Sequence, residues 1–231
     1  MNFARLLTGV LTIVLPLAAS DIVTDFSTIF NPNGPYQFGA ESTLGGAFSL
    51  GNTTVSGPGY AGWSGASGLP RIIADTMGST FTSGTVTYET DYLVLHPASD
   101  GTYAVLRYTV AVPGLYQISG AYRGQDTHGT STDVHILVNG ASAFDAEVTG
   151  YLDPSKQTFS LLSALNANDT IDFAVGFGTN GTYFYDSTGL QGTIADAAAP
   201  EPASAILILS GIALCGLFRK RSSMAWARAR S

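Results

Sequence analysis

The sequence predicts an all-β protein: an antiparallel β-sandwich of the jelly-roll kind, with an N-terminal signal peptide and one C-terminal transmembrane helix. Three observations support this prediction. No stretch between Asp21 and Ala198 repeats its apolar residues with a helical period. Instead, apolar residues alternate with polar ones over short segments, and glycine, asparagine, aspartate and proline separate these segments. The two ends of the chain each carry an apolar run beside basic residues.

Residues 1–20 are predicted to be a secretory signal peptide. Arg5 supplies the positive charge, residues 6–17 form the apolar region, and small residues at 18–20 precede a cleavage point before Asp21. A transmembrane anchor is the alternative, but the apolar run is short for a membrane span. We therefore expect the mature chain to begin near Asp21.

Residues 21–198 are predicted to form the exported β-sandwich domain. Alternating apolar residues mark strands at residues 103–110, 133–138, 159–161, 171–177 and 190–194. Asn139-Gly140 is a strong hairpin signal, because both residues tolerate a positive φ. Strands at this spacing, without helices between them, favour an antiparallel sandwich. Residues 21–68 are richer in glycine and aromatic residues and are expected to mix short strands with long loops, while residues 195–199 are the expected tether to the C-terminal segment.

Cysteine content and charge exclude several classes of protein. The single cysteine, Cys215, lies in the apolar C-terminal segment, so the domain has neither a disulfide framework nor a cysteine-based zinc site. Between Asp21 and Ala198 the chain carries four basic and sixteen acidic residues, a net charge of −12. This charge opposes binding to nucleic acid and favours cations or neutral ligands. Solubility alone is the other explanation for the acidity.

The C-terminus has three parts in a fixed order. Pro200-Glu201-Pro202 comes first, residues 203–218 are apolar, and Arg219-Lys220-Arg221 follow. A helix of this length spans about 24 Å, slightly less than a hydrocarbon core of about 30 Å, and snorkelling arginines can make up the difference. The basic cluster is expected to stay in the cytoplasm, which would place the preceding domain outside.

This order resembles the PEP-CTERM sorting signal of Gram-negative bacteria that produce exopolysaccharide. The resemblance covers residues 199–221, and residues 222–231 would be a cytoplasmic tail. It implies an inner-membrane-anchored precursor, recognition by an exosortase, removal of the tail, and delivery to the cell surface or extracellular matrix. The residues that would carry the sorting signal are Pro200, Glu201, Pro202, Arg219, Lys220 and Arg221. An ordinary C-terminal anchor is the alternative.

The same C-terminal segment is also called an ice-binding protein C-terminal domain. Ice binding would require a flat, regular threonine-rich face, and the threonines of this chain are scattered without a repeat. The domain before the segment also resembles sandwich domains found beside PEP-CTERM signals, which look like carbohydrate-binding modules. The matching stretches are residues 31–36, 95–97, 122–127, 132–140, 169–176 and 185–190. This resemblance implies a fold more firmly than an activity.

Aromatic residues in predicted loops are the candidates for sugar binding. Tyr60 and Trp63 lie in one glycine-rich loop, and Tyr183 and Tyr185 lie in another. Exposed aromatic rings indicate a binding surface, although packing at the edge of the sandwich is an equal alternative. His128, in a predicted loop, is the histidine most suited to a functional role, whereas His135 alternates with core residues and is expected on a sheet face.

Calcium is the cofactor that the acidic residues favour, because hard oxygen ligands suit it. The candidate ligands lie near loops or strand ends: Asp126, Asp133, Asp153, Asp172 and Asp186. Surface acids and Asx turns are the alternative interpretation of the same residues. Residues 176–181 match the dinucleotide pattern GxGxxG, but no helix is expected after them, so a loop between strands is the better interpretation.

The sequence favours a structural or carbohydrate-binding protein of the surface or exopolysaccharide matrix. Its expected partners are an exosortase, the inner membrane before processing, and extracellular polysaccharide. No catalytic residues stand out, because no HExxH zinc motif or full GxSxG nucleophile elbow is present. A pair of carboxylates among the sixteen acids could still support glycoside hydrolysis, so an extracellular hydrolase that acts on polysaccharide is the alternative function.

Overall fold

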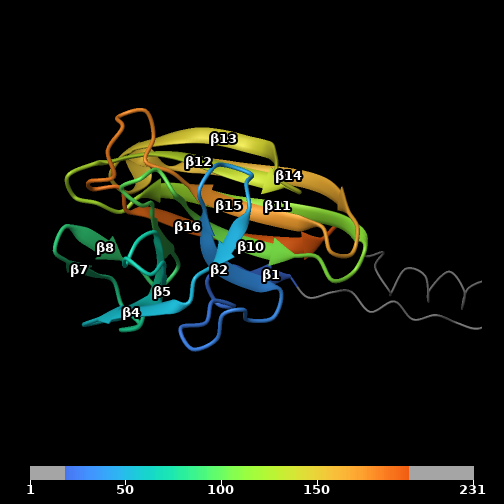
Figure 1. Ribbon diagram of the computed structural model, residues 1–231, viewed down its shortest axis with the longest axis horizontal. Coiled ribbons are helices and arrows are strands. Elements are labelled where there is room, and N and C mark those ends of the chain that lie inside the picture. Colours follow the sequence, from blue (N-terminus) through green and yellow to red (C-terminus); the bar gives the residue numbers. More distant parts are fainter. Residues whose placement is uncertain (1–18, 198–231) are drawn as a thin grey trace, which may run out of the picture. The chain divides into compact units, whose positions relative to one another are not determined.

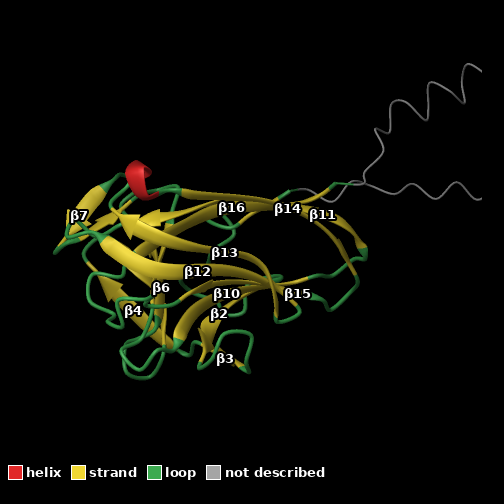
Figure 2. Ribbon diagram, turned by 90° about the horizontal axis from the view of Figure 1, so that it is seen from above, coloured by secondary structure: helices red, strands yellow, loops and turns green. Residues whose placement is uncertain are grey.

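The computed structural model describes residues 19–197, which fold into two stacked antiparallel sheets (Figures 1 and 2). Sheet A contains, in spatial order, β14 (Gln157–Leu165), β11 (Gly114–Gly124), β16 (Thr188–Asp196), β9 (Leu93–His96), β6 (Arg71–Asp75), β5 (Tyr60–Ser64) and β4 (Thr53–Gly57), and β1 (Ser20–Asp21) also pairs with β16. Sheet B contains β13 (Ala141–Gly150), β12 (Thr130–Val138), β15 (Thr170–Val175), β10 (Tyr103–Thr109), β2 (Tyr36–Glu41) and β3 (Phe48–Leu50). The prediction of an all-β antiparallel sandwich is confirmed.

Two shorter elements complete the domain. β7 (Phe81–Ser83) and β8 (Val86–Tyr88) form a separate hairpin, which Figure 1 shows beside β5. The single helical turn, η1 (Asp153–Ser155), lies between β13 and β14. As expected, residues 21–68 mix short strands, β2 to β5, with long loops.

The core lies between the two sheets, and strand alternation explains it. On β10, Leu106 points inward and is fully buried, whereas Arg107 points to the outer face of sheet B. β15 repeats this pattern with Phe173, and sheet A contributes Tyr122 from β11. Each such apolar side chain contributes roughly 1.5–3 kcal/mol on burial. A second, smaller core around Ile73 joins β6 and β9 to the β7–β8 hairpin.

The Asn139-Gly140 hairpin is confirmed. Asn139 has φ of 52° and Gly140 has φ of 78°, and they connect β12 to β13. Two consecutive positive φ angles are what a type I′ turn requires. This turn sets the pairing of β12 with β13, which carry His135 and Asp145 on the outer face of sheet B.

The predicted tether was wrong at its start. Ala195 and Asp196 continue β16, because they pair with Gln117 and Tyr116 of β11. Residues 1–18 of the predicted signal peptide, the Pro200-Glu201-Pro202 triplet, the predicted transmembrane helix at residues 203–218 and residues 219–231 lie outside the described residues. Within residues 19–197, no helix has the length and apolar character needed to cross a membrane.

Candidate functional site

Two loops bring aromatic rings together at one end of the sandwich. The β11–β12 loop carries His128, and the β15–β16 loop carries Tyr183, Phe184 and Tyr185; we call these four residues the aromatic loop surface. The His128 and Tyr185 rings stack with centroids 4.4 Å apart, and Tyr183 stacks on Phe184 at 4.6 Å. Phe184 is 61% exposed and Tyr185 is 46% exposed. The surface therefore presents apolar rings to solvent.

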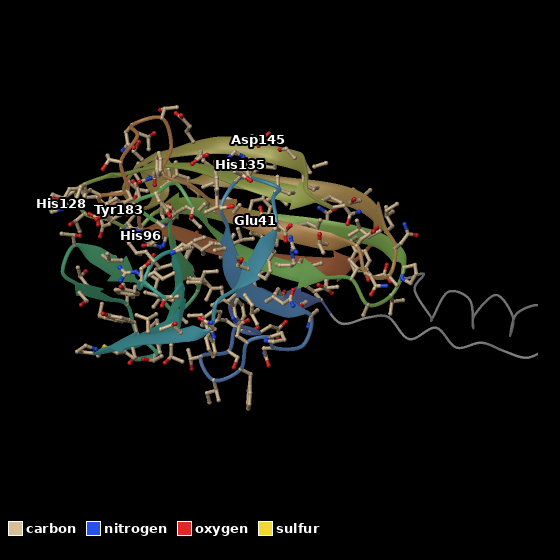
Figure 3. All side chains as sticks on the ribbon, viewed as in Figure 1. Glu41, His96, His128, His135, Asp145 and Tyr183 are labelled. Atoms are coloured by element: carbon tan, nitrogen blue, oxygen red, sulfur yellow. The ribbon has the colours of Figure 1, made fainter. Side chains whose placement is uncertain are left out.

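Strand pairing explains why these two loops meet. Val134, in the middle of β12, pairs with Val175 at the end of β15, so the first half of β12 extends beyond that strand end. In the other sheet, Gly124 at the end of β11 pairs with Thr188 at the start of β16. Both connections therefore cross between the sheets at the same end. Figure 3 shows His96, His128 and Tyr183 close together there, and the rings of His96 and Tyr183 lie edge to face at 6.1 Å.

The base of the β15–β16 loop is anchored by hydrogen bonds. Asp133 Oδ1 accepts a bond of 2.8 Å from the Gly178 amide, and Thr130 Oγ1 donates to the Ser187 carbonyl at 2.9 Å. The backbone N–H of Gln125 also donates to the Ser187 carbonyl, at 2.8 Å. The aromatic residues thus lie at an exposed tip above a fixed base.

Tyr185 has an unusual backbone conformation. Its φ is 68°, in the left-handed region where an L-residue with a Cβ is disfavoured by about 1–2 kcal/mol. Strain of this kind persists only where surrounding contacts hold it, and it concentrates at functional sites. In this conformation the Tyr185 ring stacks on the His128 ring.

Asp126 orients the second half of the surface. Its Oδ1 accepts a 2.9 Å hydrogen bond from the His128 amide, and its Oδ2 accepts one of 2.7 Å from Thr85. Asp126 is 1% exposed, so it supports the β11–β12 loop from beneath. His128, whose side chain is 54% exposed, remains accessible above it.

Asp186 is a buried carboxyl directly after the exposed rings. Its Oδ1 accepts one long bond of 3.3 Å from the Ser131 amide, and its Oδ2 has no hydrogen-bond partner within the described residues. Burial, together with repulsion from Asp133 and Asp126, raises the pKa of Asp186 to about 7. This carboxyl therefore keeps its proton at pH values where an ordinary aspartate is ionised.

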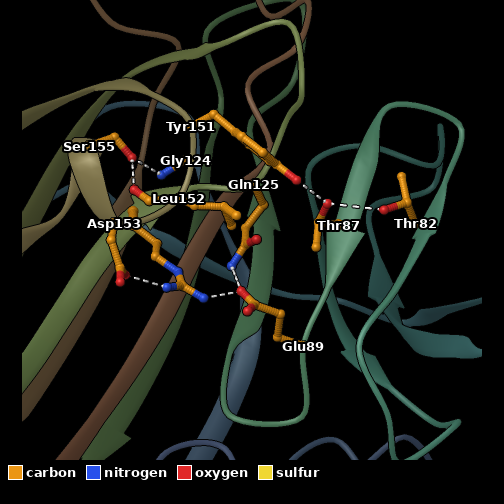
Figure 4. A network of polar contacts seen from close by, with 10 residues as sticks. Thr82, Thr87, Glu89, Gly124, Gln125, Tyr151, Leu152, Asp153 and Ser155 are labelled. Atoms are coloured by element: carbon orange, nitrogen blue, oxygen red, sulfur yellow. Dashed lines mark hydrogen bonds and ion pairs between the residues drawn. The ribbon is translucent and has the colours of Figure 1, made fainter.

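A polar network links η1 and the β8–β9 connection to the end of β11 (Figure 4). Arg123 forms ion pairs with Glu89 and, at 2.6 Å, with Asp153. Gln125 is completely buried and donates to Glu89 at 3.0 Å. Ser155 Oγ accepts the Gly124 amide at 2.8 Å. This network fixes the strand end from which the His128 loop departs.

Four of the five aspartates predicted as calcium ligands are paired with protein groups, and Asp186 is the exception described above. Arg107 binds both oxygens of Asp172, at 2.6 and 2.8 Å. Asp133 accepts bonds from Gly178, Tyr103 and His135, and Asp153 pairs with Arg123. Within residues 19–197, no three His, Cys, Asp or Glu side chains are grouped so as to hold a metal ion. Calcium binding stays a prediction.

Tyr60 and Trp63 do not belong to the aromatic loop surface. The prediction that they lie in a loop was wrong, because both are on β5, which pairs with β4 and β6. Tyr60 stacks on Tyr88 at 5.0 Å and packs against the smaller core. Trp63 packs against the main core, donates to the Ser27 carbonyl at 2.6 Å, and lines a cavity of about 170 Å³.

Phe184 is not among the site residues predicted from the sequence. It is the most exposed ring of the surface, and the Tyr-Phe-Tyr run at residues 183–185 is the sequence signal that indicates it. His135 lies as predicted on a sheet face, between Asp133 at 2.9 Å and Asp145 at 2.5 Å. Burial lowers its pKa, but hydrogen bonds to these two carboxylates outweigh burial and raise the pKa overall.

Comparisons with known proteins show partial likenesses only. No family model matches the chain, and no curated protein matches it. Among solved structures, it resembles a family 51 carbohydrate-binding module from a Clostridium perfringens GH95 protein in complex with methyl-galactose (11% identity, 64% of this chain, 95% of that chain, TM-score 0.36). It also resembles a family 35 carbohydrate-binding module from Clostridium thermocellum (14% identity, 55% and 88%, TM-score 0.31) and pika GITRL (20% identity, 41% and 75%, TM-score 0.28).

Proposed function

We propose that this chain is an exported β-sandwich module that binds carbohydrate through the aromatic loop surface. The observation that carries the proposal is the exposure of Phe184 and Tyr185 on a loop whose base is anchored. Sugar rings have apolar faces that stack on aromatic side chains, and the Tyr185 hydroxyl and the His128 ring add polar groups beside them. Anchoring reduces the entropy lost when the loop binds a ligand.

Export and sorting form the second part of the proposal. The Pro-Glu-Pro triplet, the apolar run and the basic cluster would direct the chain to an exosortase in the inner membrane of a Gram-negative bacterium, and then to the cell surface or matrix. Mass spectrometry of the extracellular form tests this part. We expect a start near Asp21 and loss of residues 203–218. An extracellular form that keeps those residues would contradict exosortase processing.

A glycan array followed by calorimetric titration tests carbohydrate binding. We expect Phe184→Ala and Tyr185→Ala each to weaken the best ligand on the array roughly 10- to 100-fold, because an aromatic residue central to an interface contributes about 2 kcal/mol or more. Val112→Ala is the matched control. Val112 is 54% exposed and lies just before β11, at the opposite end of that strand from the aromatic loop surface.

The outcomes separate the candidate functions. Unchanged affinity in both ring variants would show that sugar binds elsewhere, and no binding to any glycan would favour a purely structural matrix protein. Release of sugars from the exopolysaccharide, abolished by one carboxylate substitution, would favour the hydrolase alternative.

A further inference from the structure

β14 (Gln157–Leu165) is a free edge of sheet A. It pairs with β11 over nine residues without a register shift, and it is the last strand on that side among the described residues. The backbone N–H and C=O groups on the outer side of such a strand can pair with another strand. Figure 2 shows β14 and β11 together in one layer of the sandwich.

The other three edge strands of the two sheets, β4, β13 and β3, carry features that prevent such pairing. β13 contains a register shift opposite Ile136 and Leu137, and its exposed side chains include Asp145 and Glu147. β3 has only three residues, and β4 has five and is followed by Pro58. Bulges, exposed charges, short strands and proline are the recognised ways in which edge strands avoid pairing. None of these features falls within β14 itself, and Lys156 directly precedes the strand.

The side chains of β14 are also suited to pairing. The outward-facing positions are exposed and uncharged: Thr158, Ser160, Leu162 and Ala164. Leu162, near the middle of the strand, is 61% exposed. None of the sixteen acidic residues between Asp21 and Ala198 falls between Gln157 and Leu165. A strip without charge is therefore present on a domain of net charge −12.

We propose that β14 pairs in an antiparallel manner with β14 of a second copy of this chain, so that sheet A continues across a two-fold axis. A strand that contains no charged residue places no like charges opposite each other in any register. Elsewhere two copies repel each other through their acidic surfaces, so an uncharged strip is where self-association meets the least repulsion. A two-fold contact of this kind uses the same surface on both copies and closes as a dimer.

The symmetry gives the proposal a sharp geometric test. In antiparallel self-pairing, only the residue on the two-fold axis lies opposite itself, with Cα atoms about 4.5–5.5 Å apart. A residue two positions away is separated from its copy by a further 13–14 Å or so along the strands. A disulfide requires Cα atoms closer than about 7 Å. One position should therefore cross-link, and positions two residues to either side should not.

The experiment uses the full chain with Cys215→Ser, and with single cysteines placed in turn at each position from 158 to 164. We expect oxidation to give a covalent dimer with one sharp maximum along this series. Thr149→Cys, at an exposed position of β13, is the matched control and should give no dimer. Equal cross-linking along the series, or no dimer at any position, would overturn the proposal. This readout does not depend on carbohydrate, so it is separate from the test of the proposed function.

A second measurement protects the test against misfolded variants. Ser160→Lys combined with Leu162→Lys changes two exposed side chains and should convert the dimer to a monomer in sedimentation equilibrium, with an unchanged circular dichroism spectrum. The unmodified dimer should tighten as salt rises, because salt screens the repulsion between two acidic domains. A dimer that survives the lysine pair, or that weakens with salt, would refute pairing at β14.

Discussion

Replacing Asp186 by asparagine should stabilise the domain at neutral and higher pH. This carboxyl is completely buried, and its pKa of about 7, against an ordinary value of 3.8, reflects burial first and then repulsion from Asp133 and Asp126. Between these two values the folded chain keeps a proton that the unfolded chain has lost, so stability falls as pH rises from about 4 to 7. At 1.36 kcal/mol per pKa unit, the largest possible loss is about 4 kcal/mol. Asparagine does not ionise, so the variant does not undergo this loss of stability.

Urea unfolding of the wild-type and Asp186→Asn chains at pH 4, 5.5, 7 and 8 tests this reasoning. The difference in unfolding free energy should be smallest at pH 4 and grow with pH until about pH 8. Asp100→Asn is the control: hydrogen bonds from Thr102 lower the pKa of this exposed carboxyl, so its substitution should not stabilise the domain at any pH. A stability difference for Asp186→Asn that does not change with pH would refute the assignment of a raised pKa.

Three further predictions concern buried polar groups. Burial lowers the pKa of His96 to about 4, so wild-type stability should fall by up to about 3 kcal/mol as pH drops from 6.5 toward 4, and urea unfolding of His96→Gln should lack that component. Arg107→Met should cost about 3–5 kcal/mol by calorimetry, because it leaves the fully buried Glu41 and Asp172 without their cation; an unchanged melting temperature would contradict this. Tyr122→Phe should cost about 1 kcal/mol in urea unfolding by removing the 2.9 Å bond to the His135 carbonyl, and a neutral effect would show that this bond adds nothing.

The strands were predictable because a period of two leaves a clear pattern in the sequence. Ile171 and Phe173 point inward while Asp172 points outward, and the same alternation gave β10 and β12 correctly. Turn chemistry located the Asn139-Gly140 hairpin independently of burial. These features depend on neighbouring residues alone, so a single sequence contains them.

The loop prediction for Tyr60 and Trp63 was wrong because of the glycines beside them. Gly59 and Gly62 made the segment look like a flexible loop, yet Gly62 lies in the middle of β5. A Cβ at Gly62 would collide with the carbonyl oxygen of Ile72 on β6, so glycine is needed there for close approach of two strands. The sequence does not distinguish a glycine required by a neighbouring strand from one required by a turn.

Glycines at residues 176–181, beside the aromatic loop surface, also have more than one structural cause. A Cβ at Gly176 would collide with the Asp133 carboxylate, the group that accepts the Gly178 amide and anchors the loop. Gly181, in contrast, has open space where a Cβ would lie, but its φ of 67° is in the left-handed region that favours glycine. The close approach of Asp133 at Gly176, together with the positive φ angles of Gly178 and Gly181, accounts for the pattern without a phosphate. Because Asp133 is on β12 and Tyr185 is on the loop beyond β15, only strand pairing brings the anchor and the exposed ring to the same end of the sandwich.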